Sequence, residues 1–135
     1  MSPDRTALLY ERYPAIFPEN NRRLKQSLMG LGFSCRDGWF DLINELYAAL
    51  QADVDRGDFP QVEAVQVNEK FAGLRFYFGP FDKAADALIE EAQTRSHSIC
   101  EVCGAPGALR GLNHAHHTRC DQHADKGSVI VPKGT

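Results

Sequence analysis

Two short stretches decide the organisation of this chain: Cys100-Glu101-Val102-Cys103-Gly104 and Cys120-Asp121-Gln122-His123. Each carries a pair of metal-binding side chains with two residues between them, and this spacing lets both members reach one ion without strain. Gly104 suits the tight knuckle after the first pair, because glycine readily adopts a positive φ. The sequence therefore predicts one structural Zn²⁺ ion, bound by Cys100, Cys103, Cys120 and His123.

The fourth ligand and the state of the thiols have alternatives. Any of three histidines shortly before the second pair could replace His123 as a ligand; these are His114, His116 and His117. If no metal is bound, the cysteines of the two pairs would instead form a disulfide or remain as free thiols. The remaining cysteine, Cys35, lies far from the others in sequence, and an odd thiol beside a zinc set indicates a reducing, cytoplasmic environment.

The segment between the two ligand pairs predicts a short β-hairpin. Ala105-Pro106-Gly107 is a turn sequence, and residues 108–112 can extend after it. If the second pair begins a helix, the module is a treble clef, which we favour; two facing knuckles would instead form a zinc ribbon. In both forms four protein ligands leave no coordination position for a reactive water, so the metal is expected to be structural.

The fold class predicted for the whole chain is α+β. Residues 1–95 are expected to form a core of helices packed on a β-hairpin or small antiparallel sheet, and residues 96–135 a zinc-binding module packed on this core. Helices are predicted to begin at Ser2-Pro3, at Asp37 and at Pro80. The helix from Asp37 to about Arg56 is the strongest, with Asp37 as its cap and one apolar face. That face consists of Trp39, Ile43, Leu46, Leu50 and Val54.

Alternating apolar residues predict a hairpin between the second and third helices. Its strands are Val62 to Glu69, with Val65 and Val67 on one face, and Gly73 to Phe78. Four polar side chains near the turn are predicted to point outward and to form a partner-binding surface; they are Glu69, Lys70, Arg75 and Tyr77. The rival interpretation is cross-strand ion pairing in water.

The charge balance gives no general reason to expect a nucleic acid or a membrane as partner, because the formal net charge is −3. No apolar run long enough for a membrane span is present, and charged residues interrupt the N-terminus where a signal peptide would need its apolar core. The one basic cluster, Arg22, Arg23 and Lys25, is more typical of a solvated turn than of a phosphate site.

Four blocks of the sequence resemble a family of small uncharacterised proteins from tailed phages and proteobacteria. The blocks are Asp37 to Ile43, Gln66 to Tyr77, Cys100 to Gly107 and Thr118 to Ala124, and the resemblance covers most of residues 37–124. It implies zinc binding but no known activity. The chain departs from the family pattern at Asn113 to His117, where members usually have Gly-Trp. The phage association suggests a counter-defence factor that binds a host protein.

The function favoured from the sequence is that of a small intracellular zinc protein, not an enzyme, that acts by binding another protein. One alternative is a nucleic-acid-binding zinc module, and the other is an HNH-like treble-clef nuclease that depends on a metal. Such a nuclease needs a histidine on the strand and an asparagine or histidine on the following helix. After His123 the sequence shown has no further histidine or asparagine, and Asp125 and Lys126 are the nearest charged residues.

Overall fold

A computed structural model describes residues 1–18 and 33–131 of the chain. The fold is α+β, as predicted. The basic cluster Arg22 to Lys25 lies outside the described residues, so its assignment stays a prediction. The elements are α1 (Pro3–Arg12), η2 (Asp37–Trp39), α3 (Phe40–Asp55), β1 (Glu63–Lys70), β2 (Gly73–Gly79), α4 (Lys83–Ser96), β3 (Ala108–Leu112), β4 (Ala115–Arg119) and β5 (Val129–Ile130). No helix among the described residues has the length and apolar character that crossing a membrane requires.

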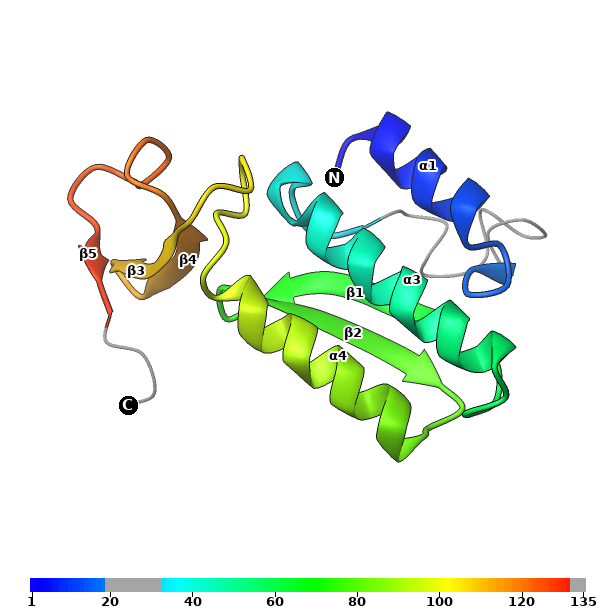
Figure 1. Ribbon diagram of the computed structural model, residues 1–135. Coiled ribbons are helices and arrows are strands. Elements are labelled where there is room, and N and C mark those ends of the chain that lie inside the picture. The colour runs from blue at the N-terminus through cyan, green and yellow to red at the C-terminus, as the bar shows by residue number, and fades with distance from the viewer. Residues whose placement is uncertain (19–32, 132–135) are drawn as a thin grey trace.

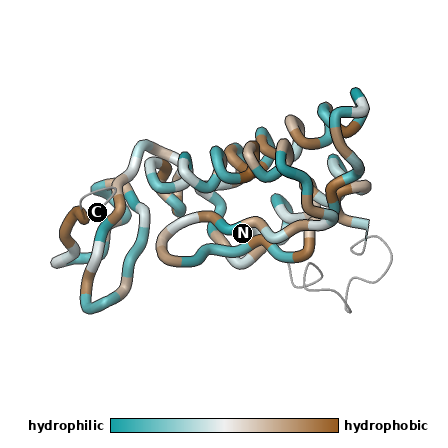
Figure 2. Tube along the Cα trace, turned by 90° about the horizontal axis from the view of Figure 1, so that it is seen from below, coloured by the Kyte–Doolittle hydropathy of each residue, from teal (hydrophilic) through white to brown (hydrophobic). Residues whose placement is uncertain are grey.

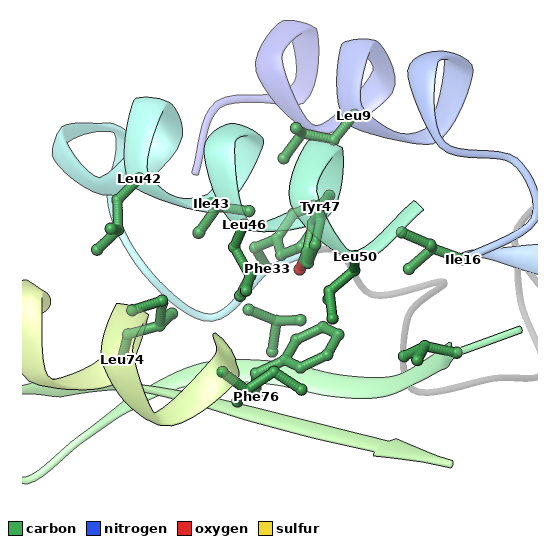
Figure 3. Packing of buried hydrophobic residues seen from close by; sticks show 14 of the residues in the cluster. Leu9, Ile16, Phe33, Leu42, Ile43, Leu46, Tyr47, Leu50, Leu74 and Phe76 are labelled. Atoms are coloured by element: carbon green, nitrogen blue, oxygen red, sulfur yellow. The ribbon is translucent and has the colours of Figure 1, made fainter. Parts of the chain in front are cut away.

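The core lies between the helices and the β1–β2 hairpin (Figure 1). Leucine and isoleucine side chains from α3 point toward the hairpin, where Leu74 and Phe76 point back at them (Figure 3). The Tyr47 and Phe76 rings meet with their centroids 5.3 Å apart. Each large side chain buried in this way contributes roughly 1.5–3 kcal/mol to the free energy of unfolding, so α3 is the main anchor of the core.

The ends of the helices agree only in part with the sequence. Ser2 caps α1, and its hydroxyl accepts a hydrogen bond from the Arg5 amide, as predicted. The prediction that Asp37 caps the long helix is wrong, since no side chain caps η2 or α3. The Asp37 carboxylate instead accepts a hydrogen bond from the Ser2 amide and pairs with Arg5. These two contacts lower the pKa of Asp37. The carboxylate therefore ties the N-terminal segment to the start of η2.

The β1–β2 hairpin closes through a two-residue turn at Phe71 and Ala72, whose φ angles are 53° and 66°. Its register shifts between Ala64 and Gln66, which makes Val65 the extra residue of a β-bulge. The prediction that Val65 and Val67 lie on one face is therefore wrong, because Val65 is 51% exposed while Val67 is buried. A one-residue insertion reverses the face of every residue on one side of it.

Side chains of α4 line the free edge of β2. The Leu74 amide donates to the Ser96 hydroxyl at 2.9 Å, and the Phe76 amide donates to the Gln93 side-chain oxygen at 3.1 Å. Asp82 caps the start of α4. At the other end Arg95 pairs with Glu45 of α3 at 3.1 Å, which makes a bridge between the two helices.

The C-terminal module lies at one end of the core and is joined to α4 by a short connection (Figures 1 and 2). Strands β4, β3 and β5 form a three-stranded sheet in that order, all antiparallel. The predicted hairpin is confirmed as β3 and β4, which are joined by a turn at Asn113 and His114 with φ angles of 50° and 69°. The edge strand β5 is exposed and hydrophobic.

Candidate metal centre

Four side chains of the module converge on one point: Cys100, Cys103, Cys120 and His123. Their ligand atoms all lie within 4.8 Å of one another. The Cys103 and Cys120 sulfurs are 3.7 Å apart. The His123 Nδ1 atom lies 3.8 Å from the Cys100 sulfur and 3.2 Å from the Cys120 sulfur. This predicted set is therefore assembled and could hold a metal ion, with His123 as the fourth member.

Two tight turns bring the ligands together. In the first, the Gly104 amide donates to the Cys100 carbonyl at 2.9 Å, and Gly104 has the positive φ of 81° expected of it. In the second, the His123 amide donates to the Cys120 carbonyl at 3.1 Å. Each turn brings its two metal-binding side chains close together, which is the arrangement that a shared ion requires.

Backbone amides around the first turn favour the thiolate form of Cys100. Burial raises the pKa of this thiol, but hydrogen bonds from the amides of Cys120, Cys103 and Val102 lower it more, to about 6. Those amides favour the anion by donating to it directly. A metal needs a cysteine in its thiolate form, so the backbone prepares Cys100 for binding.

The second ligand pair does not begin a helix. Residues 121–123 form a turn, and no helix lies among residues 120–131. The expectation of a helix start at Cys120 is therefore wrong, and the two facing turns match the zinc-ribbon alternative better than the treble clef. The following helix that an HNH-like nuclease needs is likewise not found among these residues.

The remaining candidate ligands lie elsewhere. His114 is exposed in the β3–β4 turn, His116 is exposed on β4, and His117 faces a separate cluster described below. Cys35 is buried in the core of the protein, and burial raises its pKa to about 12. Its thiol therefore stays protonated, and Cys35 is not one of the four converging side chains.

The centre is held against the start of the long helix by close backbone contacts. The Gly38 amide donates to the Glu101 carbonyl at 2.9 Å, and the Trp39 indole donates to the Ile99 carbonyl at 2.9 Å. Near the hairpin turn, the buried Thr118 hydroxyl donates to the Ala72 carbonyl at 2.7 Å. These contacts attach the module to η2 and to the tip of the β1–β2 hairpin.

A buried carboxylate between the first two cysteines forms a second cluster, which was not predicted from the sequence. Glu101 is 3% exposed, and its Oε1 atom lies 2.9 Å from the Arg119 guanidinium and 3.2 Å from His117 Nδ1. The Glu69 Oε1 atom lies 3.9 Å from the same nitrogen. Burial and the Glu101 charge raise the pKa of Glu69, although His117 opposes them. A charged residue inside a metal knuckle was the one signal of this cluster.

The residues predicted to form a partner surface divide between the two faces of the hairpin. The register pairs Asn68 with Arg75 and Gln66 with Tyr77, so these residues share the outward face, and Lys70 lies on it as well. Tyr77 is 42% exposed. Glu69 alternates with Asn68 and faces the module instead, so its assignment to the outward group is wrong.

A scan of protein-family models and searches of the curated proteins and of the solved structures found no match for this chain. The resemblance to phage and proteobacterial proteins therefore stays a prediction from the sequence.

Proposed function

We propose that this protein holds one structural Zn²⁺ ion and acts by binding another protein. The spacing of the four donor atoms supports the zinc assignment. In a tetrahedral site with Zn–S bonds of about 2.3 Å and a Zn–N bond of about 2.0 Å, two sulfurs lie about 3.8 Å apart and a sulfur and nitrogen about 3.5 Å. The Cys103–Cys120 sulfur separation of 3.7 Å agrees closely with this geometry. The distances from His123 Nδ1 to the Cys100 and Cys120 sulfurs, 3.8 Å and 3.2 Å, lie on either side of the expected value.

The donor chemistry points to the same ion. Three thiolates and one imidazole form a soft set that suits zinc better than magnesium or calcium, which prefer oxygen ligands. Because four protein ligands fill a tetrahedral shell, the ion has no open position for substrate or water. Its role in this proposal is to fold the two turns together and to hold the module on η2 and the hairpin tip.

The proposed contact surface for a protein partner is the outward face and tip of the β1–β2 hairpin, which we call the hairpin surface. It comprises Val65, Lys70, Phe71, Arg75 and Tyr77. Phe71 is 77% exposed at a turn position with positive φ, where asparagine or glycine is the ordinary choice. Folding alone does not explain an exposed phenyl ring there. Tyrosine and arginine are also enriched among residues that dominate binding energy.

The resemblance to phage-associated proteins supports a host protein as the partner. A small counter-defence factor of this kind would alter its target by occupying a surface, without chemistry of its own. This part of the proposal rests on the family resemblance and on the hairpin surface together.

Metal analysis tests the zinc assignment. Protein purified without chelators is expected to contain one zinc per chain, and Cys120→Ser is expected to lower that content sharply because it removes a central ligand. Zinc well below one per chain in the unmodified protein would contradict the proposal. The variant His114→Ala is the matched control and is expected to keep the full equivalent, since His114 lies outside the ligand set.

Site-specific cross-linking tests the partner surface. A photoreactive phenylalanine analogue replaces Tyr77 in one protein and Glu90, exposed on α4, in another. A defined protein adduct is expected from position 77 only, and Arg75→Ala should weaken it without a change in melting temperature. Equal adducts from both positions would refute the surface. A gel shift with DNA or RNA that weakens steeply with salt would instead favour the nucleic-acid alternative.

A further inference from the structure

The cluster of Glu69, Glu101 and His117 brings three metal-binding side chains from separate parts of the chain to one point. Glu69 lies near the end of β1, Glu101 lies in the first knuckle and His117 lies on β4. One ligand atom of each lies within 4.8 Å of the other two. We propose that this cluster is a second, exchangeable site for a transition-metal dication, separate from the Cys3His centre.

An unsatisfied nitrogen is the first observation that supports the site. His117 Nδ1 is buried and makes no hydrogen bond, although carboxylate oxygens lie 3.2 Å and 3.9 Å from it. Buried polar atoms are almost always paired, so each exception calls for an explanation, and a bound ion is one of them. A cation that accepts the nitrogen lone pair supplies that partner, and it also relieves the repulsion between the carboxylates of Glu69 and Glu101.

The donor set and its spacing agree with this assignment. One imidazole and two carboxylates suit Zn²⁺, Mn²⁺ or Fe²⁺, whereas Mg²⁺ and Ca²⁺ prefer oxygen alone. Around an ion with bonds of about 2.1 Å, neighbouring ligand atoms lie about 3.0–3.5 Å apart. The Glu101 oxygen is already at 3.2 Å from Nδ1. The Glu69 oxygen is at 3.9 Å on a side chain that is 26% exposed, so a small rotation brings it in.

Neighbouring arginines set the strength of the site. Arg119 lies 2.9 Å from Glu101 Oε1, and Arg36 lies 3.9 Å from the same atom. Arg119 also pairs with Asp125 at 3.1 Å. The region has a net charge of −1 when His117 is neutral. This charge is the sum of three carboxylates and two guanidiniums, which belong to Glu69, Glu101, Asp125, Arg36 and Arg119. The field therefore still favours a cation, but less strongly than three thiolates do, and the ion is expected to exchange.

A cation here would join the core to the module directly. It would connect β1 with the first knuckle and β4, beside the Thr118 contact with the hairpin tip. Three protein ligands do not fill the coordination shell of the ion. Water can reach the remaining positions, because His117 and Glu69 are both partly exposed. The second ion is thus expected to strengthen the attachment between the two parts and to remain accessible from solvent.

Equilibrium dialysis of the zinc-loaded full chain against buffered free Zn²⁺, followed by metal analysis, tests the site. The unmodified protein is expected to take up a second equivalent, and its melting temperature is expected to rise as it does so. His117→Ala and Glu69→Gln should each weaken this uptake at least about tenfold. Every variant should retain the first equivalent, which shows that the Cys3His centre is intact whatever happens at the second site.

The matched control is the double variant His114→Ala/His116→Ala, which removes two exposed histidines of the same hairpin and leaves the cluster untouched. It is expected to bind the second equivalent as the unmodified protein does. Stoichiometry that stays at one, or a second equivalent that His117→Ala retains and the control loses, would overturn the proposal. Loss of the first equivalent in the unmodified protein would instead refute the structural zinc centre.

Discussion

Replacing Gly38 by alanine is the sharpest test of how the module is attached to the core. A β-carbon added at Gly38 would lie 2.1 Å from the Cys100 carbonyl oxygen and 2.5 Å from the Glu101 carbonyl carbon. Ordinary contact begins at 3.4 Å, so the two backbones must separate by about 1.3 Å, the difference from 2.1 Å. Both atoms belong to the backbone of the first knuckle and cannot rotate away as a side chain would.

The expected cost follows from the contacts that such a separation breaks. The hydrogen bonds from the Gly38 amide to Glu101 and from the Trp39 indole to Ile99 each contribute about 1 kcal/mol. Forcing extra volume into a packed contact costs roughly 1–3 kcal/mol more. We therefore expect Gly38→Ala to lower the free energy of unfolding by about 3–5 kcal/mol, a large share of the 5–15 kcal/mol typical of a domain.

Urea unfolding followed by the fluorescence of Trp39, the single tryptophan, measures this change. Gly79→Ala is the matched control, because no atom lies within 4 Å of the position of its added β-carbon. The control is expected to change the free energy by no more than about 0.5 kcal/mol. If Gly38→Ala unfolds at the same urea concentration as Gly79→Ala, the backbone contact described here does not hold the module.

Three further substitutions and one metal removal test other parts of the structure. Cys103→Ser should leave the purified protein with well under one zinc per chain; an unchanged metal content would contradict its role as a ligand. Trp39→Ala should lower the free energy of unfolding by about 3–5 kcal/mol, measured by circular dichroism, because the side chain is fully buried. Phe71→Gly should raise the free energy of unfolding by about 0.5–1 kcal/mol, since it relieves a positive φ at an exposed side chain; a lower urea midpoint would mean that the phenyl ring makes stabilising contacts. Chelation of the metal should shift the emission of Trp39 toward that of an indole in water, because its hydrogen-bond acceptor directly precedes a ligand, and added zinc should reverse the shift; an unchanged spectrum would show that the module does not depend on the ion.

Local sequence patterns were sufficient for α1, α3, α4, the two hairpins and the four candidate metal ligands. The period of the apolar residues from Trp39 to Leu50 indicates one buried helix face, and these positions are buried in the structure. The two-residue spacers within each ligand pair likewise describe turns that form within a few residues. Such features depend on residues that are close together in the chain, so they can be predicted from the sequence directly.

Features that depend on distant contacts were missed or misassigned. The bulge at Val65 depends on how β1 aligns with β2. The alternation of apolar residues along β1 does not show that one residue of the strand lacks a partner on β2. Glu69 was placed on the outward face because its neighbours are polar, whereas its position in the register directs it at the module. Asp37 serves the N-terminal segment rather than its own helix. In each case the deciding partner lies far away in sequence.

The contacts along both edges of the β1–β2 hairpin limit how a partner can recognise it. On the β2 side, the Leu74 and Phe76 amides already donate to Ser96 and Gln93 of α4. On the β1 side, the segment at Ser34 donates to Val67 and accepts from Glu69. An extended peptide therefore finds these backbone groups occupied and cannot add itself as a further strand. In the proposed complex, recognition would therefore use side chains on the open face, and specificity would depend on their chemistry rather than on backbone pairing.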